Sequence, residues 1–197
     1  MAPPQLTEDE IDDLLYSSRA GEKEDLSTLL SALAEREKVS PAEILASARD
    51  EGKSTCLHMA TGNGHLDIVT LLLSQFDSRP REEKQAFLDA PNEFENMGLH
   101  WAALGGHLDV VKLLVENGAS VALANNQNYV PLDLANFNDK REVAEYFLKR
   151  AGMLESDNAD GGLKEAVADV ELKEADSDEV DETSAEAETG SAPPGTN

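Results

Sequence analysis

Along the first 150 residues of the chain, apolar side chains occur in short groups with members three and four positions apart. In 66–73 and again in 108–115, leucine, isoleucine and valine recur at this spacing, which places them on one face of an α-helix. Each group follows a second short helical pattern, and a glycine and a histidine separate the two. The pattern predicts an all-α fold built from pairs of short helices, each pair joined by a tight turn.

One structural unit is used at least twice, because segments 57–69 and 99–111 align with each other residue for residue. Both begin with Leu-His and pass through a glycine corner to Gly-His-Leu-Asp. A third copy follows 33 residues after the second, with Leu132 in the place of Leu99, and ends in an apolar face. The residues expected to form that face are Val143, Phe147 and Leu148. A period of 33 residues predicts a solenoid in which each unit packs on the next.

An earlier unit is recovered at an offset of 43 residues, although it lacks both histidines. Leu14 and Gly21 stand where Leu57 and Gly64 stand in the first full copy. A terminal unit that departs from the repeat in this way is typical of a cap. We therefore expect about four helix-pair units over residues 6–152.

Other local patterns lie between the repeats. Residues 7–10 and 40–43 have the sequence of capping boxes, and each predicts the start of a helix. The first two full copies are 42 residues apart rather than 33, so nine residues are inserted in or near 74–91. Within this insertion, 79–84 has the pattern of an exposed bend before a short helix. Two interpretations stay open, a recognition element and a tolerated loop extension.

The repeat resembles the ankyrin family, whose units follow the pattern Thr-Pro-Leu-His-x-Ala-Ala-x-x-Gly-His. The first copy reads Thr-Cys-Leu-His from Thr55, and the second has Met-Gly from Met97 in place of Thr-Pro. The third has Val-Pro from Val130, with aspartate in place of the first histidine. These departures lie at turn or solvent-side positions, so the resemblance implies an ankyrin-repeat solenoid.

The formal net charge is −24, and the C-terminal end is the most acidic part. Residues 151–197 carry 14 acidic and two basic side chains and almost no large apolar ones. Such a segment buries too little surface to offset the entropy of ordering, so we expect 153–197 to be a disordered acidic tail. We expect 1–5 to be disordered as well. Two roles for the tail stay open, a solubilising appendage and a mobile polyanion that shields a basic partner.

The charge also narrows the class of partner. A polyanion repels phosphate backbones and anionic lipid, which argues against direct nucleic-acid or membrane binding and favours a basic protein. The first residues lack the pattern of a secretory signal, and nowhere do 18 apolar residues run together. Cys56 is the only cysteine, which suits a reducing compartment. We expect a soluble, intracellular protein.

Four histidines are candidates for a metal site or a catalytic base. They are His58, His65, His100 and His107. They recur as pairs at the same repeat positions, which is what a structural role predicts, and no cysteine or carboxylate cluster accompanies them. The ankyrin resemblance implies that the first of each pair braces a turn and the second supports a helix corner. We expect no metal, no cofactor and no enzyme activity.

The ankyrin resemblance also implies a binding groove, lined by the variable positions of the first helix of each unit. Five of these nine positions are large and apolar, and a monomer without a partner should not expose such a stripe. The candidate residues on the stripe are Met59, Asn63, Trp101, Leu104, Leu134 and Phe137. The turn tips beside it contribute Glu93, Glu95, Asn128 and Tyr129. This surface suits an amphipathic basic helix, although some stripe residues could instead pack against neighbouring units.

Within the ankyrin family, the four-unit layout, the inserted loop and the Tyr-Phe-Leu-Lys ending at 146–149 are similar to those of a chaperone dedicated to a ribosomal protein. This resemblance implies binding of newly made, basic small-subunit ribosomal protein S-three through its N-terminal region. It implies action in the cytoplasm and nucleus, while the terminal caps favour a monomer or a one-to-one complex. Two other functions stay open, a regulatory adaptor or inhibitor of a nuclear factor and an acidic histone chaperone.

Overall fold

The computed structural model describes residues 3–159, and in that range it contains ten helices and no strand. The first helices of four pairs are α1 (Glu8–Ala20), α4 (Cys56–Asn63), α7 (Gly98–Gly105) and α9 (Pro131–Phe137). The second helices are α2 (Lys23–Glu37), α5 (Leu66–Ser74), α8 (Leu108–Glu116) and α10 (Arg141–Ala159). Two further helices, α3 (Pro41–Ser47) and α6 (Arg81–Leu88), follow the first and second pairs. The predicted all-α fold of helix pairs is confirmed.

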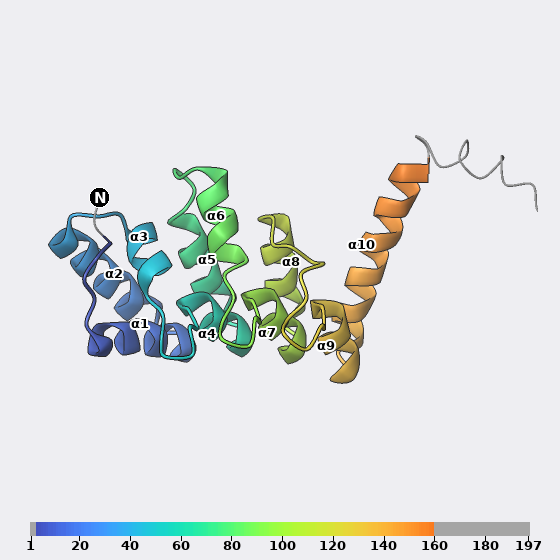
Figure 1. Ribbon diagram of the computed structural model, residues 1–197, viewed down its shortest axis with the longest axis horizontal. Coiled ribbons are helices and arrows are strands. Elements are labelled where there is room, and N and C mark those ends of the chain that lie inside the picture. The colour runs from blue at the N-terminus through green and yellow to red at the C-terminus, as the bar shows by residue number, and fades with distance from the viewer. Residues whose placement is uncertain (1–2, 160–197) are drawn as a thin grey trace, which may run out of the picture. The chain divides into compact units, whose positions relative to one another are not determined.

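The pairs stack in chain order. The first helices lie in one row, and α2, α5 and α8 stand in a second row above them (Figure 1). α4 packs between α1 and α7, and α7 packs on α9, so each unit contacts the next. Leucines at equal repeat positions, Leu14, Leu57 and Leu99, are fully buried in this stack. Burying such a side chain contributes about 1.5–3 kcal/mol, so the repeated leucines are a main source of stability.

The last helix corrects one detail of the predicted core. Val143 and Phe147 are four residues apart, and both are buried, as predicted. Leu148 is 57% exposed, so its expected place on the same face is wrong. One residue turns an α-helix by about 100°, which carries Leu148 away from the face of Phe147.

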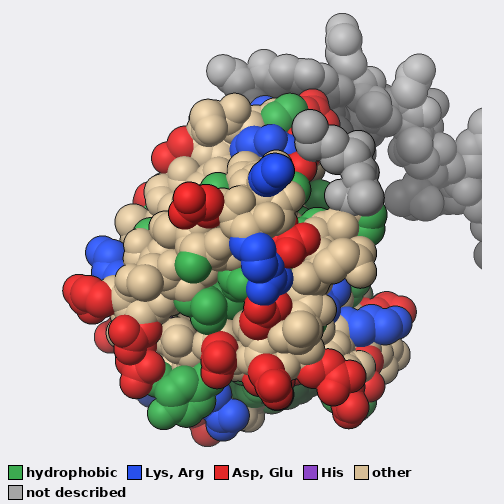
Figure 2. All heavy atoms as spheres, turned by 90° about the vertical axis from the view of Figure 1, so that its left-hand side faces the viewer, with side chains coloured by type: hydrophobic (Ala, Val, Ile, Leu, Met, Phe, Trp, Pro, Cys, Tyr) green, Lys and Arg blue, Asp and Glu red, His purple; other side chains and the backbone are tan. Residues whose placement is uncertain are grey.

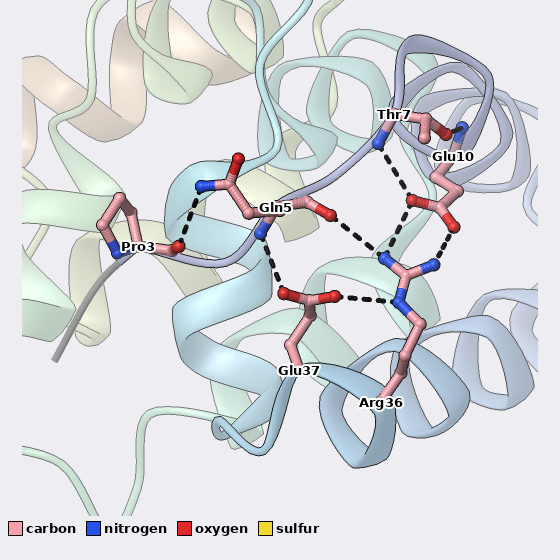
Figure 3. A network of polar contacts seen from close by, with 6 residues as sticks. All are labelled: Pro3, Gln5, Thr7, Glu10, Arg36 and Glu37. Atoms are coloured by element: carbon pink, nitrogen blue, oxygen red, sulfur yellow. Dashed lines mark hydrogen bonds and ion pairs between the residues drawn. The ribbon is translucent and has the colours of Figure 1, made fainter.

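The segment before α1 is bound to the end of α2 (Figure 3). The backbone N–H of Gln5 donates to Glu37 Oε2 at 2.9 Å, and Arg36 Nη2 donates to the Gln5 carbonyl at 3.1 Å. Arg36 also pairs with Glu10 in the first turn of α1. These bonds hold Gln5 against the first unit, and the disorder expected for 1–5 stays a prediction. The partners of Gln5 lie about 30 residues further along the chain, where the local pattern does not reveal them.

Both predicted capping boxes are present. The Glu10 N–H donates to Thr7 Oγ1 and the Thr7 N–H donates to Glu10 Oε2, at 3.3 and 2.9 Å. Ser40 and Glu43 repeat this exchange at the start of α3. Because such caps satisfy N–H groups that have no partner inside the helix, each contributes about 1 kcal/mol.

The inserted segment folds onto the stack and contains α6, the short helix predicted there. Phe87 of α6 stacks on Phe76, which follows α5, with ring centroids 4.6 Å apart. Asp89 accepts hydrogen bonds from the backbone N–H and the hydroxyl of Ser120 in the next unit, at 2.9 and 2.5 Å. The bend at 79–84 is largely exposed. The insertion therefore has a packing role, and binding by its bend stays a prediction.

The predicted acidic tail, 153–197, lies outside the described residues from 160 onward. The backbone of 153–159 continues α10, so the helix runs past the domain boundary expected at 152. Within the described range, no helix is long and apolar enough to cross a lipid bilayer.

Candidate protein-interaction surface

The turns between units are shaped by short polar side chains that accept hydrogen bonds from their own backbone. Asn92 Oδ1 accepts from two N–H groups of its turn at 3.0 Å, and Asn125 Oδ1 does the same in the next turn. Asp50 Oδ1 accepts one such bond at 2.7 Å. The two later turns are joined to each other, because the Asn126 N–H donates to the Phe94 carbonyl at 3.2 Å. The turn tips are thereby fixed along one edge of the first helices.

The first histidine of each pair joins its unit to the following turn. His58 Nδ1 accepts from the Thr55 N–H at 3.1 Å, and its Nε2 bonds the Asn96 carbonyl at 2.8 Å. His100 bonds the Tyr129 carbonyl in the same way at 3.0 Å. Burial lowers the pKa of His58 to about 4 and also lowers the pKa of His100. Both rings are therefore neutral at pH 7 and act as structural donors to carbonyls.

The second histidine of each pair supports the helix corner of the preceding unit. His65 Nε2 bonds the Arg19 carbonyl at 2.8 Å, and His107 Nε2 bonds the Gly62 carbonyl at 3.1 Å. Gly64 caps α4 at φ +77°, and a Cβ there would lie 2.5 Å from His107 Nδ1. The glycine is therefore required by both its conformation and its neighbour. All four histidines serve the stack, and the described residues contain no metal-binding group of three or more side chains.

Cys56 is fully buried at the start of α4. Burial raises the pKa of its thiol to about 11, against a smaller opposite effect of a hydrogen bond with Ser18. A thiol with a pKa this far above neutral pH holds almost no thiolate. The side chain therefore packs in the core as a neutral thiol.

The second helices leave one side of the first helices uncovered. We use the name open face for this side together with the adjoining turn tips. Trp101, Leu104 and Leu134 come together here beside the tips and line a hollow of about 120 Å³. Each of the three is half-buried. The Trp101 ring lies against Gly62 of the preceding unit. A Cβ added to that glycine would be 3.6 Å from the ring, which is van der Waals contact. The stripe is thus less exposed than predicted.

The other predicted stripe residues lie at different depths. Met59 is half-buried and packs against the core, while Phe137 is 63% exposed on α9. Asn63 is exposed, and its amide donates to the Met59 carbonyl at 2.9 Å. The stripe therefore has one exposed aromatic side chain, Phe137, at its C-terminal end. Its other apolar side chains are half-buried and form its floor.

The predicted rim residues are all exposed. Glu93 and Glu95 lie at one turn tip, and Asn128 and Tyr129 lie at the next. The Tyr129 ring meets the Phe137 ring edge to face, with centroids 5.0 Å apart. This contact joins the rim to the stripe. We call the Tyr129–Phe137 ring pair the aromatic step.

Two exposed aromatic residues of the open face were missing from the predicted site. Tyr16 on α1 is 63% exposed, and Phe94 at the second turn tip is 53% exposed. The 43-residue offset places Tyr16 in register with Met59, so the repeat itself could have revealed Tyr16. Phe94 aligns with Gly52 at an offset of 42, so no repeated apolar position pointed to it.

The N-terminal end of the stack is acidic. Figure 2 faces this end and shows Asp and Glu side chains gathered along its lower edge, with fewer Lys and Arg among them. A hollow of about 570 Å³ here is lined by four carboxylates, together with Ile11, Arg49 and Gly52. The four are Glu8, Asp12, Asp50 and Glu51. Such a grouping makes the local potential negative and attracts basic partners.

Comparison with known proteins places the chain in a family. Models of the ankyrin repeat match residues 53–80 and 82–158, the second as an array of three copies. The chain belongs to the ankyrin-repeat family. Its ankyrin fold is shared with many proteins, since 429 chains of known structure match it. No curated protein sequence matches.

One solved structure with this fold is similar along most of the chain. It is the crystal structure of the yeast ribosomal protein Rps3 in complex with its chaperone Yar1. The sequences are 34% identical, and the match covers 74% of this chain and 95% of the yeast chain with a TM-score of 0.68. The chain is therefore similar in both sequence and fold to a chain of this yeast chaperone complex, as the sequence resemblance implied.

Proposed function

We propose that this protein is a dedicated chaperone for a newly made, basic protein of the small ribosomal subunit, namely S-three. The observation that carries the proposal is the similarity to a chain of the yeast Rps3–Yar1 structure. The two chains are 34% identical, and the match covers 95% of the yeast chain. The protein would bind the client through the client's N-terminal region, keep it soluble and deliver it for ribosome assembly. It would act by binding alone, without enzyme activity, in the cytoplasm and nucleus.

The charge of the chain supports a basic client. A ribosomal protein that is not yet on its RNA carries uncompensated positive charge and associates with polyanions. A stoichiometric partner with a net charge of −24 masks that charge. No nucleotide-driven cycle is needed, because ribosomal RNA has a higher density of negative charge and can compete for the client.

The open face is the proposed binding surface. Its half-buried floor around Trp101, its aromatic step at Tyr129 and Phe137, and its carboxylates at Glu93 and Glu95 match an amphipathic basic helix. The apolar side of such a helix would cover the floor, and its lysines and arginines would reach the rim. We propose a one-to-one complex with no direct contact to nucleic acid or membrane.

Affinity purification of the tagged full chain from its own cells tests the proposal. Quantitative mass spectrometry should find S-three in an amount equal to the bait. An unrelated bait of similar net charge should not retain it. Histones in place of S-three would support an acidic histone chaperone, and a single nuclear factor would support a regulatory adaptor; either result would contradict the proposal.

A further inference from the structure

We propose that the hollow between α3 and α6 is a second contact surface for the client, which receives an uncharged, apolar part of S-three from outside its N-terminal region. The inference rests on the proposed function and extends the interface beyond the open face. The residues assigned to the open face do not line this hollow. Both helices stand above the row of first helices (Figure 1), on the side of the stack where α2 and α5 lie.

The hollow is formed by a helix that the chain uses twice. Ile44 and Leu45 of α3 are repeated 43 residues later as Phe87 and Leu88 of α6, and all four side chains are buried. In the described chain, no helix stands at this place between α8 and α9, where the units follow one another at 33 residues. Insertions in a solenoid gather on one face of the stack, which is often a binding face. The repeated helix therefore marks this face of the first two units as a candidate contact surface.

Apolar groups make up most of the lining. The hollow has a volume of about 410 Å³, within the range of about 300–1,000 Å³ that is typical of binding pockets. The stacked rings of Phe76 and Phe87 take part in the lining. Four alanines complete the apolar surface, namely Ala42 and Ala46 of α3, Ala86 of α6 and the adjoining Ala90. Because alanine side chains are short, the hollow has room for large apolar side chains from a partner.

Two arginines link the segments that border the hollow. Arg79 Nε lies 2.7 Å from Glu83 Oε2 in α6, and its Nη1 lies 3.9 Å from Glu43 Oε2 in α3. Arg49, which follows α3, donates to the carbonyl of Pro91, which follows α6, at 3.2 Å. These links favour one spacing of the two helices, so the hollow exists before a partner binds. A preformed site reduces the entropic cost of binding.

The charge of the lining determines which occupant fits. The lining contains two glutamates and two arginines, so its formal net charge is zero in a chain whose net charge is −24. Both glutamates, Glu43 and Glu83, already contact Arg79, so a client lysine or arginine would meet no unpaired carboxylate. An uncharged apolar side chain would cover the alanine and phenylalanine surface without desolvating an isolated carboxylate. The hollow therefore fits apolar residues rather than a basic helix.

The hollow adjoins the acidic N-terminal end of the stack. Arg49 lines it and also lines the acidic hollow that contains Glu8, Asp12, Asp50 and Glu51. Those carboxylates attract a basic client, so apolar side chains of the same client come within reach of α3 and α6. Because the N-terminal region of S-three is assigned to the open face, the occupant is a later part of S-three.

Filling the hollow tests the second contact. Ala46→Gln and Ala86→Gln together place two neutral side chains in the hollow, at exposed helical positions where glutamine is well tolerated. Full-length S-three should bind this double variant about fivefold or more weakly than the unaltered chain, because side chains of the client no longer fit. A synthetic peptide of the S-three N-terminal region should bind both chains equally. Ala32→Gln, at an exposed position on α2, is the matched control, and isothermal titration calorimetry measures the affinities.

The possible outcomes separate the second contact from the proposed function. Equal affinity of the double variant and the control for full-length S-three would overturn the second contact and leave the proposed function in place. A matching loss of peptide affinity would also overturn it, because the N-terminal region would then itself occupy the hollow. Circular dichroism verifies that the double variant is folded, and Ala46→Gln alone replaces it if it is not. An unaltered chain that binds no S-three would instead contradict the proposed function.

Discussion

Trp101 is half-buried, between the core and the solvent. Its substitution therefore distinguishes an effect on client binding from an effect on the free energy of unfolding. Trp101→Ala should weaken client binding by about 2 kcal/mol or more, because a central aromatic anchor is lost. Its ring is half-buried against Gly62, so the free energy of unfolding should fall by less than the roughly 3–5 kcal/mol typical of a fully buried aromatic residue. Isothermal titration calorimetry and urea unfolding give the two values. Normal client binding by a folded variant would contradict the assignment of Trp101 to the binding surface. The bend at 79–84 would then be the next surface to test.

The buried histidines make stability depend on pH. The pKa of His58 is lowered to about 4 from an ordinary value of 6.5, chiefly by burial, and that of His100 is lowered as well. Between pH 6.5 and 4 the unfolded chain binds protons that the folded chain does not, so stability should fall as the pH falls. His58 alone accounts for a loss approaching about 3 kcal/mol. NMR titration of the imidazole signals and urea unfolding at pH 7 and 5 measure this, and an imidazole that titrates near 6.5 would contradict it.

The roles of single residues were predictable where the repeat duplicates them. His58 and His100 occupy the same position, and their equivalent hydrogen bonds follow from it. The depth of Trp101 was not predictable, because it depends on a glycine in the preceding unit that leaves room for the ring. The bonds of Gln5 were hidden for a similar reason, since they involve residues distant in the sequence.

The helix corner of the second unit gives a prediction at the scale of elements. Gly64→Ala should lower the free energy of unfolding by about 2–4 kcal/mol, because a left-handed alanine is strained and its Cβ displaces the His107 ring. Gly152→Ala, inside α10 with open space around it, is the matched control and should raise stability by about 0.5–1 kcal/mol. Urea unfolding measures both, and equal effects of the two substitutions would contradict the proposed role of the corner.

Helix positions were predictable because local signals mark them. The capping boxes at 7–10 and 40–43 begin α1 and α3, and the glycine corners end α4 and α7. The face of α10 was predicted only in part. Leu148 belongs to an apolar run, but the helical period turns it to the solvent, so burial follows geometry more closely than hydrophobicity.

At the scale of the whole molecule, the charge predicts a strong effect of salt on client binding. Affinity for S-three should fall as salt rises from low to physiological strength, where screening acts beyond about 8 Å. Deletion of residues 156–197 should preserve the fold and remove mainly the salt-sensitive part of the affinity. Calorimetric titrations at several salt concentrations compare the two chains. An affinity that does not change with salt would leave the electrostatic argument without support.

The central claim is that one molecule of this chain holds one molecule of S-three in solution. The most direct measurement is light scattering coupled to size-exclusion chromatography of the purified pair at physiological salt. The account predicts a complex with the summed mass of one copy of each protein and S-three that stays soluble. Separate elution of the two proteins, or precipitation of S-three despite an equal amount of the chain, would contradict the account.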